Sequence, residues 1–182
     1  MNKAFFLDRD GTIIQDVHYI NNVDDVELIN KAAEAIKLMH QSGFKVYVVT
    51  NQGGIAKGLV TEQNYVDVNN QIQNLLYANY KIDGFVCCPH HPDVKKCHCR
   101  KPNALLINAI ARYNDIDLHQ SYMIGDKMSD VEAGINAGCK KSVLILTGHG
   151  NEYKTEAEQR NITYYNDLFE AVQNILGDNN ED

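Results

Sequence analysis

Short apolar runs alternate along the chain with longer stretches in which apolar residues recur at helical spacing. The runs are rich in β-branched and aromatic residues, which favour strands, and several of them stop at a polar residue. The pattern predicts buried strands at residues 3–7, 44–49, 84–88, 121–125 and 142–146, and a weaker strand at 162–165.

The stretches between these strands predict helices. In residues 30–41, for example, Ala33, Ile36 and Met39 fall on one side of a helix that Ser42-Gly43 would end. The same reasoning predicts helices at 61–80, 104–113, 129–137 and 167–176. Because strands separated by helices usually pair in parallel, we expect an α/β fold with a Rossmann-like parallel sheet and helices on both faces. Ligands of such folds bind at the carboxyl ends of the strands.

Composition narrows the class of protein. The chain has 182 residues, of which 44% are hydrophobic and 23% charged, as expected for a single globular domain over residues 1–182. Residues 177–182 are polar and acidic and predict a flexible tail. The net charge of −7 argues against a nucleic-acid partner, because an acidic chain gains little from counterion release.

The same sequence gives expectations about location and assembly. No apolar stretch approaches the ~20 residues that span a bilayer, which argues against a membrane partner. The N-terminus meets charge too soon for a secretory signal, so we expect a cytoplasmic protein. No long heptad pattern predicts a second copy, which favours a monomer.

Polar residues stand where predicted strands end. Asp8, Thr50 and Asp126 each follow a strand, so a parallel sheet would bring them to one edge. Two carboxylates two residues apart, Asp8 and Asp10, can share a phosphoryl group and a magnesium ion: one attacks phosphorus while the other moves a proton. Gly11 allows the sharp turn that follows. Alone, this motif would also fit a solvated loop.

Other residues add to the first motif. Thr50 offers a hydroxyl group, and the next three residues can present backbone N–H groups to an anion; they are Asn51, Gln52 and Gly53. Lys101 can neutralise charge on a phosphoryl group during transfer. Asp126 and Asp130 add carboxylates that suit a hard cation.

A cysteine- and histidine-rich segment predicts a second metal site. Our proposed zinc ligands are Cys88, His90, Cys97 and Cys99, with His91 and His98 as competing ligands; ordinary thiols in a polar loop are the alternative. Four protein ligands leave no open position, so the zinc in the loop at 88–99 would be structural and would help to fix Arg100 and Lys101. We expect Cys87 and Cys139 to be buried thiols.

These motifs, in this order, resemble the haloacid dehalogenase (HAD) superfamily. The matching pieces are Asp8-x-Asp10, Thr50, Lys101, and Gly125-Asp126 with Asp130. The resemblance implies that Asp8 is the nucleophile and Asp10 the acid/base. It implies that magnesium is held by Asp8, the Asp10 carbonyl and Asp126, while Thr50 and Lys101 steady the phosphoryl group.

A closer resemblance is to the D-glycero-D-manno-heptose 1,7-bisphosphate phosphatases, whose relatives include the phosphatase half of histidinol-phosphate enzymes. It rests on FLDRDGT, VVTNQGGIAKG, CPHHP, CHCRKP and IGDKMSD. The resemblance implies a capless fold, with too few residues before Thr50 for a large cap. It also implies substrate contacts at Arg9, Asp16, His18, Tyr19, Asn51, Gln52, Gly53, Arg100 and Lys127. Arg100 would bind a second phosphate through a bidentate contact.

The sequence departs from this family at three places. Gly53 replaces the usual serine, the loop between His90 and Cys97 is short, and residues 17 and 18 differ from the usual pair. These departures leave the chemistry intact and the specificity and the anomer preference open.

Four functions therefore compete. The first is removal of the 7-phosphate of a heptose 1,7-bisphosphate for lipopolysaccharide synthesis, and the second is hydrolysis of histidinol phosphate, whose ammonium group Asp16 could meet. A polynucleotide 3′-phosphatase is disfavoured by the acidic charge. The intact motifs disfavour a zinc module without catalysis.

Overall fold

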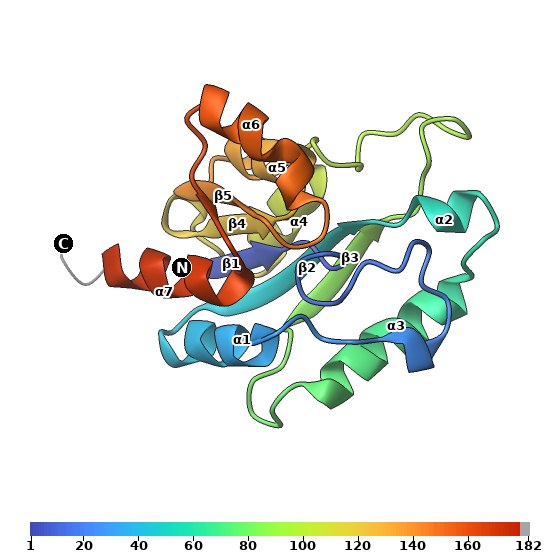
Figure 1. Cartoon of the computed structure of the whole chain (residues 1–182), viewed down its shortest axis with the longest axis horizontal. Helices are drawn as coiled ribbons and strands as arrows, with labels where there is room; N and C mark the ends of the chain where they lie inside the picture. Colours follow the sequence, from blue (N-terminus) through green and yellow to red (C-terminus); the bar gives the residue numbers. More distant parts are fainter. Residues whose placement is uncertain (179–182) are drawn as a thin grey trace.

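The computed structural model describes residues 1–178. These form one six-stranded parallel sheet and seven helices, and helices cover both faces of the sheet (Figure 1). The strands are β1 (Ala4–Leu7), β2 (Lys45–Asn51), β3 (Gly84–Cys88), β4 (Tyr122–Gly125), β5 (Lys141–Ile145) and β6 (Tyr164–Tyr165). Their order across the sheet is β3-β2-β1-β4-β5-β6, so the chain reverses its direction of travel between β1 and β4. Such a reversal opens a crevice at the carboxyl ends of the strands.

Side-chain alternation in β1 explains why both faces of the sheet are covered. Phe5 and Leu7 belong to one buried cluster, whereas Ala4 and Phe6 belong to another. All four side chains are fully buried, because apolar residues pack on both faces of the sheet and β1 lies between β2 and β4.

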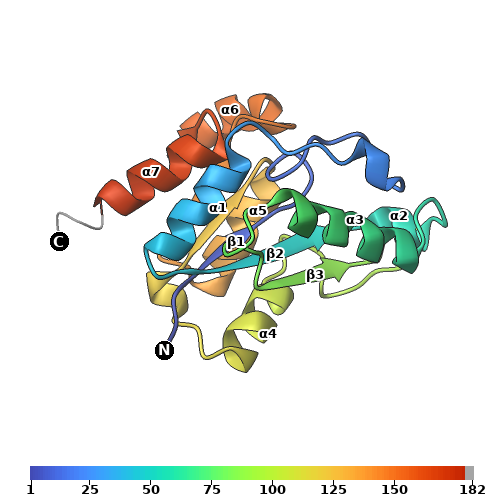
Figure 2. The same cartoon turned by 90° about the horizontal axis from the view of Figure 1, so that it is seen from below.

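Seven helices complete the layers. They are α1 (Ala32–Gln41), α2 (Gly53–Ala56), α3 (Glu62–Leu75), α4 (Leu105–Tyr113), α5 (Met128–Ala137), α6 (Gly150–Gln159) and α7 (Leu168–Asp178), with short 3-10 helices at Val23–Asp25 and Leu118–Gln120. Apolar residues of α1, α3 and α7 pack on the face that carries Phe5, whereas α4 and α5 pack on the face that carries Phe6. Figure 2 shows α1 and α4 on opposite sides of the sheet.

The predicted fold class is confirmed, with local corrections. The helix predicted at 61–80 ends at Leu75, because Leu76 adopts an extended conformation. Helix α6 was not predicted from the sequence. Gly177 and Asp178, placed in the predicted tail, belong to α7, and the rest of that tail lies outside the described residues. Within residues 1–178, no helix has the length and apolar character needed to cross a membrane.

Candidate active site

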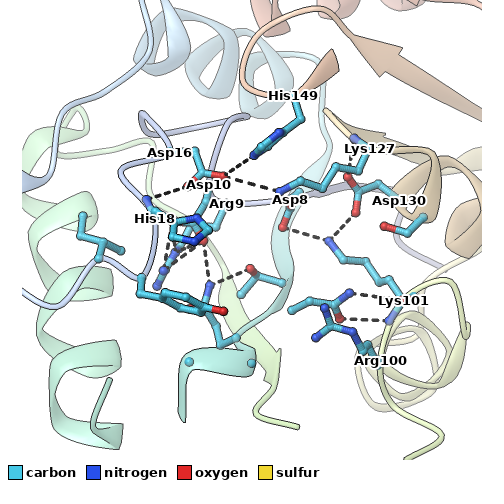
Figure 3. Close-up of a pocket in the computed structure, with 18 residues that line it drawn as sticks. Asp8, Arg9, Asp10, Asp16, His18, Arg100, Lys101, Lys127, Asp130 and His149 are labelled. Atoms are coloured by element: carbon cyan, nitrogen blue, oxygen red, sulfur yellow. Dashed lines mark hydrogen bonds and ion pairs between the residues drawn. The ribbon is translucent and has the colours of Figure 1, made fainter. Parts of the chain in front are cut away.

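Three neighbouring strands bring the first group of functional side chains together. Asp8 directly follows β1, Thr50 is the last residue but one of β2, and Asp126 directly follows β4. Here β2 extends two residues beyond the predicted strand, so Thr50 is part of the strand. Asp8 and Thr50 line a cavity of about 260 Å³ (Figure 3), and a carboxylate oxygen of Asp126 lies within 4.8 Å of one of Asp8.

Lys101 lies at the floor of this cavity. Its side-chain nitrogen Nζ is 2.9 Å from Asp8 Oδ1 and 2.7 Å from Asp130 Oδ1, and it donates a hydrogen bond to the Val49 carbonyl at 2.6 Å. Burial lowers the pKa of Lys101, but Asp130 and Asp8 outweigh it and raise the pKa to about 12. The ammonium group therefore stays charged beside Asp8.

Three buried carboxylates surround one potential metal position. Ligand oxygens of Asp8, Asp126 and Asp130 lie within 4.8 Å of one another. Burial first, and then the charge of Asp8, raises the pKa of Asp126 to about 7; burial likewise raises the pKa of Asp130 to about 6 against the opposing effect of Lys101. Asp126 Oδ1 is buried without a hydrogen-bond partner, so the oxygen donors suit a magnesium ion.

Two glycines allow the neighbouring loops to approach Asp126 closely. Gly11 has φ +81°, and a Cβ atom there would lie 2.3 Å from Asp126 Oδ2. Gly148, with φ +52°, would place a Cβ atom at the same distance from the same oxygen. The loops after β1 and β5 can therefore close over Asp126 only because both positions are glycine.

The carboxylate of Asp10 is held away from this metal group. It accepts hydrogen bonds from Arg9 Nε and Nη2 at 3.1–3.3 Å, and Gln52 Nε2 donates to its Oδ2 at 2.7 Å. Gln52 also donates to Thr50 Oγ1 at 3.0 Å. Arg9, predicted to contact substrate, lines the cavity but is 1% exposed and pairs with Asp10.

The side chain of Asn51 holds the backbone of Lys101 in place. Its Oδ1 accepts from the Lys101 N–H at 3.0 Å, and its Nδ2 donates to the Lys101 carbonyl at 3.2 Å. The side chain of Asn51 therefore positions a neighbouring cation, a role that the sequence did not indicate.

A polar rim surrounds the mouth of the cavity. Asp16 Oδ2 lies 3.2 Å from His149 Nε2 and 3.5 Å from Lys127 Nζ, and Asp16 Oδ1 accepts from the His18 N–H at 3.0 Å. Burial raises the pKa of Asp16, but these donors and cations outweigh it and leave the pKa below its ordinary value. His18 and Tyr19 have φ values of +57° and +59°, conformations rare for such residues and often found at binding sites.

The four proposed zinc ligands form a compact group. The sulfur of Cys88 lies 3.5 Å from that of Cys97 and 3.2 Å from that of Cys99, and His90 Nδ1 lies 3.3 Å from Cys99 Sγ. The distances far exceed a disulfide bond and suit ligands of one tetrahedral ion.

The competing ligands lie apart from this group. His91 faces Asp93, with Nδ1 3.4 Å from its carboxylate, and His98 lines a separate groove. Cys87 and Cys139 lie outside the group and are half-buried rather than buried; burial raises the pKa of both thiols, that of Cys139 to about 12.

Arg100 and Gly53 connect the zinc loop to the cavity. Arg100 Nη1 donates to the His90 carbonyl at 3.1 Å, so the loop sets the direction of the guanidinium. A Cβ atom on Gly53 would lie 2.9 Å from His91 Cδ2. The ring of His91 thus occupies the space that a serine side chain would need.

The cavity gathers every residue predicted to act in catalysis or substrate binding: Asp8, Arg9, Asp10, Asp16, His18, Tyr19, Thr50, Asn51, Gln52, Gly53, Arg100, Lys101 and Lys127. Four further lining residues were not predicted, namely Ile20, Gly54, Ser129 and His149. His149 lies in the loop that follows β5, at the same carboxyl edge of the sheet as Asp8, and this position was the signal that could have indicated it.

The fold and the site define a class, which comparison with known proteins supports. A parallel sheet with a buried aspartate after its central strand and a lysine against it is the arrangement of HAD-like hydrolases. A family model described as HAD-hydrolase-like matches residues 98–171.

Relatives identify the family within this class. The D-glycero-beta-D-manno-heptose-1,7-bisphosphate 7-phosphatase of Haemophilus ducreyi is 37% identical over 177 residues, which cover 93% of this chain and 96% of the relative. The corresponding alpha enzyme of Photorhabdus laumondii is 35% identical and covers 92% of this chain and 93% of the relative. The chain belongs to the heptose-1,7-bisphosphate 7-phosphatase family and is a phosphoric monoester hydrolase.

A solved structure supports the same conclusion. The crystal structure of D,D-heptose 1.7-bisphosphate phosphatase from B. bronchiseptica, complexed with magnesium and phosphate, has a TM-score of 0.88 and 29% identity to this chain. The match covers 97% of this chain and 99% of that chain.

Proposed function

We propose that this protein is a magnesium-dependent phosphatase that removes the 7-phosphate of a D-glycero-D-manno-heptose 1,7-bisphosphate. The observation that carries the proposal is the buried Asp8–Lys101 pair at the floor of a cavity whose rim is cationic. Relatives with this named activity match nearly the whole chain.

The chemistry follows from the positions of the two aspartates. In the first step Asp8 attacks phosphorus, the bond to the sugar oxygen breaks, and protonated Asp10 gives its proton to that oxygen. In the second step Asp10 takes a proton from water, the water oxygen bonds to phosphorus, and the bond to Asp8 breaks. The products are the heptose 1-phosphate, inorganic phosphate and free Asp8.

Lys101 and Thr50 stabilise the transferring group. Asn51 holds the backbone of Lys101, and Asp130 and the Val49 carbonyl hold its ammonium group, which can offset negative charge on the phosphoryl oxygens without reorganising. Asp8, Asp126 and the carbonyl of Asp10 would hold magnesium, which supplies further neutralisation of phosphoryl charge. Asp130, already paired with Lys101, serves better as the partner of that lysine than as a metal ligand.

The rim favours an anionic sugar over a cationic substrate. Asp16 is already paired with Lys127 and His149, so it is a poor site for the ammonium group of histidinol phosphate. Arg100 is directed by the zinc loop and can receive the second phosphate through a bidentate contact.

The Cys88, His90, Cys97 and Cys99 group would hold a structural zinc ion. The proposed enzyme works in the cytoplasm as a monomer on a small sugar phosphate and serves the synthesis of nucleotide-activated heptose for lipopolysaccharide. A single domain over residues 1–182 suffices for this reaction.

The test is a comparison of two substrates with purified protein and saturating magnesium. We expect kcat/KM for heptose 1,7-bisphosphate to exceed that for histidinol phosphate by ~100-fold or more, which corresponds to about 2.7 kcal/mol. The Asp8→Asn variant should form no phosphoenzyme and serves as the matched control. A preference for histidinol phosphate would overturn the substrate assignment but not the chemistry.

A further inference from the structure

Arg9 is the largest fully buried side chain of the protein among the described residues, yet it carries a charge. Its guanidinium uses Nε and Nη2 to bind the carboxylate of Asp10, at distances between 3.1 and 3.3 Å. A buried charge persists only where its hydrogen-bonding groups are satisfied, so its remaining donors need partners.

Helix α3 supplies a partner for the far side of the guanidinium. Arg9 Nη1 donates to Asn69 Oδ1 at 3.2 Å, and Asn69 is 7% exposed. Tyr65, one turn earlier on the same face of α3, places its ring 5.6 Å from Arg9 Cζ. The guanidinium is therefore held at one edge by an amide, on one face by an aromatic ring, and at the other edge by Asp10.

Neither α3 residue belongs to the residues that line the cavity. Asn69 and Tyr65 therefore cannot act on a bound substrate directly, and their effect must pass through Arg9. Helix α3 is itself well anchored: a capping box of Thr61 and Asn64 begins it, and Val68 and Ile72 pack in the core. It is a rigid support rather than a mobile lid.

The two aspartates of the site are thus held by different cations with different supports. Asp8 pairs with Lys101, which Asn51 grips, and Asp10 pairs with Arg9, which Asn69 grips. Separate supports keep two carboxylates, only two residues apart, in two orientations.

We propose that Asn69 and Tyr65 are positioning residues for the reaction: through Arg9 they fix the carboxyl group of Asp10 where it can transfer a proton to the leaving oxygen. This inference rests on the proposed acid/base role of Asp10. The planar guanidinium of Arg9 sets the orientation of the Asp10 carboxyl group as well as its distance. Loss of Asn69 or Tyr65 would therefore turn that carboxyl group away from the leaving oxygen while the group itself stays in the site.

The test uses the Asn69→Leu variant, which keeps the size of the side chain and removes the acceptor. Two substrates are compared in single-turnover phosphorylation with saturating magnesium: a sugar phosphate, whose leaving alkoxide needs a proton, and 2,4-dinitrophenyl phosphate, whose leaving phenolate does not. Because general acid catalysis is worth 10²–10⁴-fold, partial misdirection should slow the sugar phosphate by about tenfold. The dinitrophenyl substrate should slow by less than about twofold, and steady-state KM, measured separately, should stay unchanged for both.

Two variants of matched size serve as controls. Asn69→Asp keeps an acceptor for Nη1 and should restore most of the rate with the sugar phosphate. Asn70→Leu makes the same change at the next position of α3, which is exposed, and should behave like the wild type. Leaving a buried donor unpaired costs about 1–3 kcal/mol, so all rates are measured well below the melting temperature of Asn69→Leu.

The outcomes separate this inference from the proposed function. Equal slowing of both substrates by Asn69→Leu, or no slowing of either, would overturn the positioning role. If Asp10→Asn abolishes turnover while Asn69→Leu is fully active, the positioning role of Asn69 is wrong and the acid/base role of Asp10 stands. If Asp10→Asn keeps its activity on the sugar phosphate, the proposed function itself fails.

Discussion

Lys101 is the residue on which the charge balance of the site depends. Its ammonium group lies between two buried carboxylates and the Val49 carbonyl, and its side chain is only 1% exposed. Removing one partner of such a group leaves uncompensated charge in the interior. Catalysis and stability are therefore coupled at this position.

Replacing Lys101 with Met should lower kcat by about 10²–10³-fold, the effect expected for the loss of one electrostatic stabiliser. It should also destabilise the fold by ~3–5 kcal/mol, because Asp8 and Asp130 lose their shared cation. Chemical denaturation and steady-state kinetics measure the two effects. The double variant Lys101→Met/Asp130→Asn should recover part of the stability and none of the activity; recovery of activity would contradict the proposed role.

Asp126 gives a prediction about pH in the metal-free protein. Burial, and then Asp8, raises its pKa from 3.8 to about 7, so the folded state holds a proton that the unfolded state has released. The contribution of Asp126 to the free energy of unfolding is fully present below pH ~4 and is lost as the pH rises toward 7. With chelator present, Asp126→Asn should therefore gain stability relative to the wild type between pH 4 and 7. A stability difference independent of pH across this window would show that Asp126 is not the group responsible.

The ring of His91 occupies the space next to Gly53. A Cβ atom there would lie 2.9 Å from the ring, so Gly53→Ala should cost ~1–3 kcal/mol of stability through overpacking. In the His91→Ala background the same change should cost little, and the double-mutant cycle measures the coupling. Additive effects would mean that the two residues are not in contact.

At the scale of elements, the loop at residues 88–99 brings four potential metal ligands together without a helix or strand of its own after Cys88. The segment between β3 and α4 lacks regular structure up to the end of the loop, as Figure 1 shows, and four side chains converge within it. Cys99, the last of the proposed ligands, directly precedes Arg100, so zinc binding in the loop would also order the cations of the cavity.

The Cys97→Ser variant should bind less zinc, melt at a lower temperature and raise KM for the bisphosphate by about tenfold, because Arg100 loses its fixed direction. Metal analysis, thermal unfolding and kinetics test these three effects. His98→Ala, which changes a neighbouring residue outside the ligand group, should leave all three unchanged. An unchanged zinc content in Cys97→Ser would remove Cys97 from the ligand set.

Elements with strong hydrophobic patterns were predictable, and polar ones were not. Strand β3 lies where the sequence predicted it, because a short apolar run between polar segments has few alternatives. Helix α6 was missed because only Gly150 and Ala157 of its residues are buried, so its sequence carries little periodicity. The boundary of α3 was missed because Leu76 is apolar and buried but extended.

The same contrast applies to the site. Positions at strand ends located Asp8, Thr50 and Asp126, since sheet topology alone brings them together. The support of Arg9 could not be predicted, because nothing in sequence spacing places Asn69 of α3 beside Arg9. Long-range side-chain pairs of this kind depend on packing that local pattern does not encode.

At the scale of the whole molecule, β1 is the central element of the site and pairs on both sides. Its partner β2 follows closely in the chain, whereas its other partner begins at Tyr122. Asp8 and Asp126 therefore meet at the seam between β1 and β4, where the part of the chain made first pairs with the part made later.

This seam has a consequence for how the protein is made. During translation, β1 and β2 can pair soon after leaving the ribosome, but the far edge of β1 stays open until Tyr122–Gly125 emerges. A nascent chain paused before that point exposes an apolar strand edge, the kind of surface that chaperones must shield. Products of this gene that stall or end before Tyr122 would therefore be inactive and prone to aggregate, and the arrival of β4 both closes this edge of β1 and brings Asp126 to Asp8.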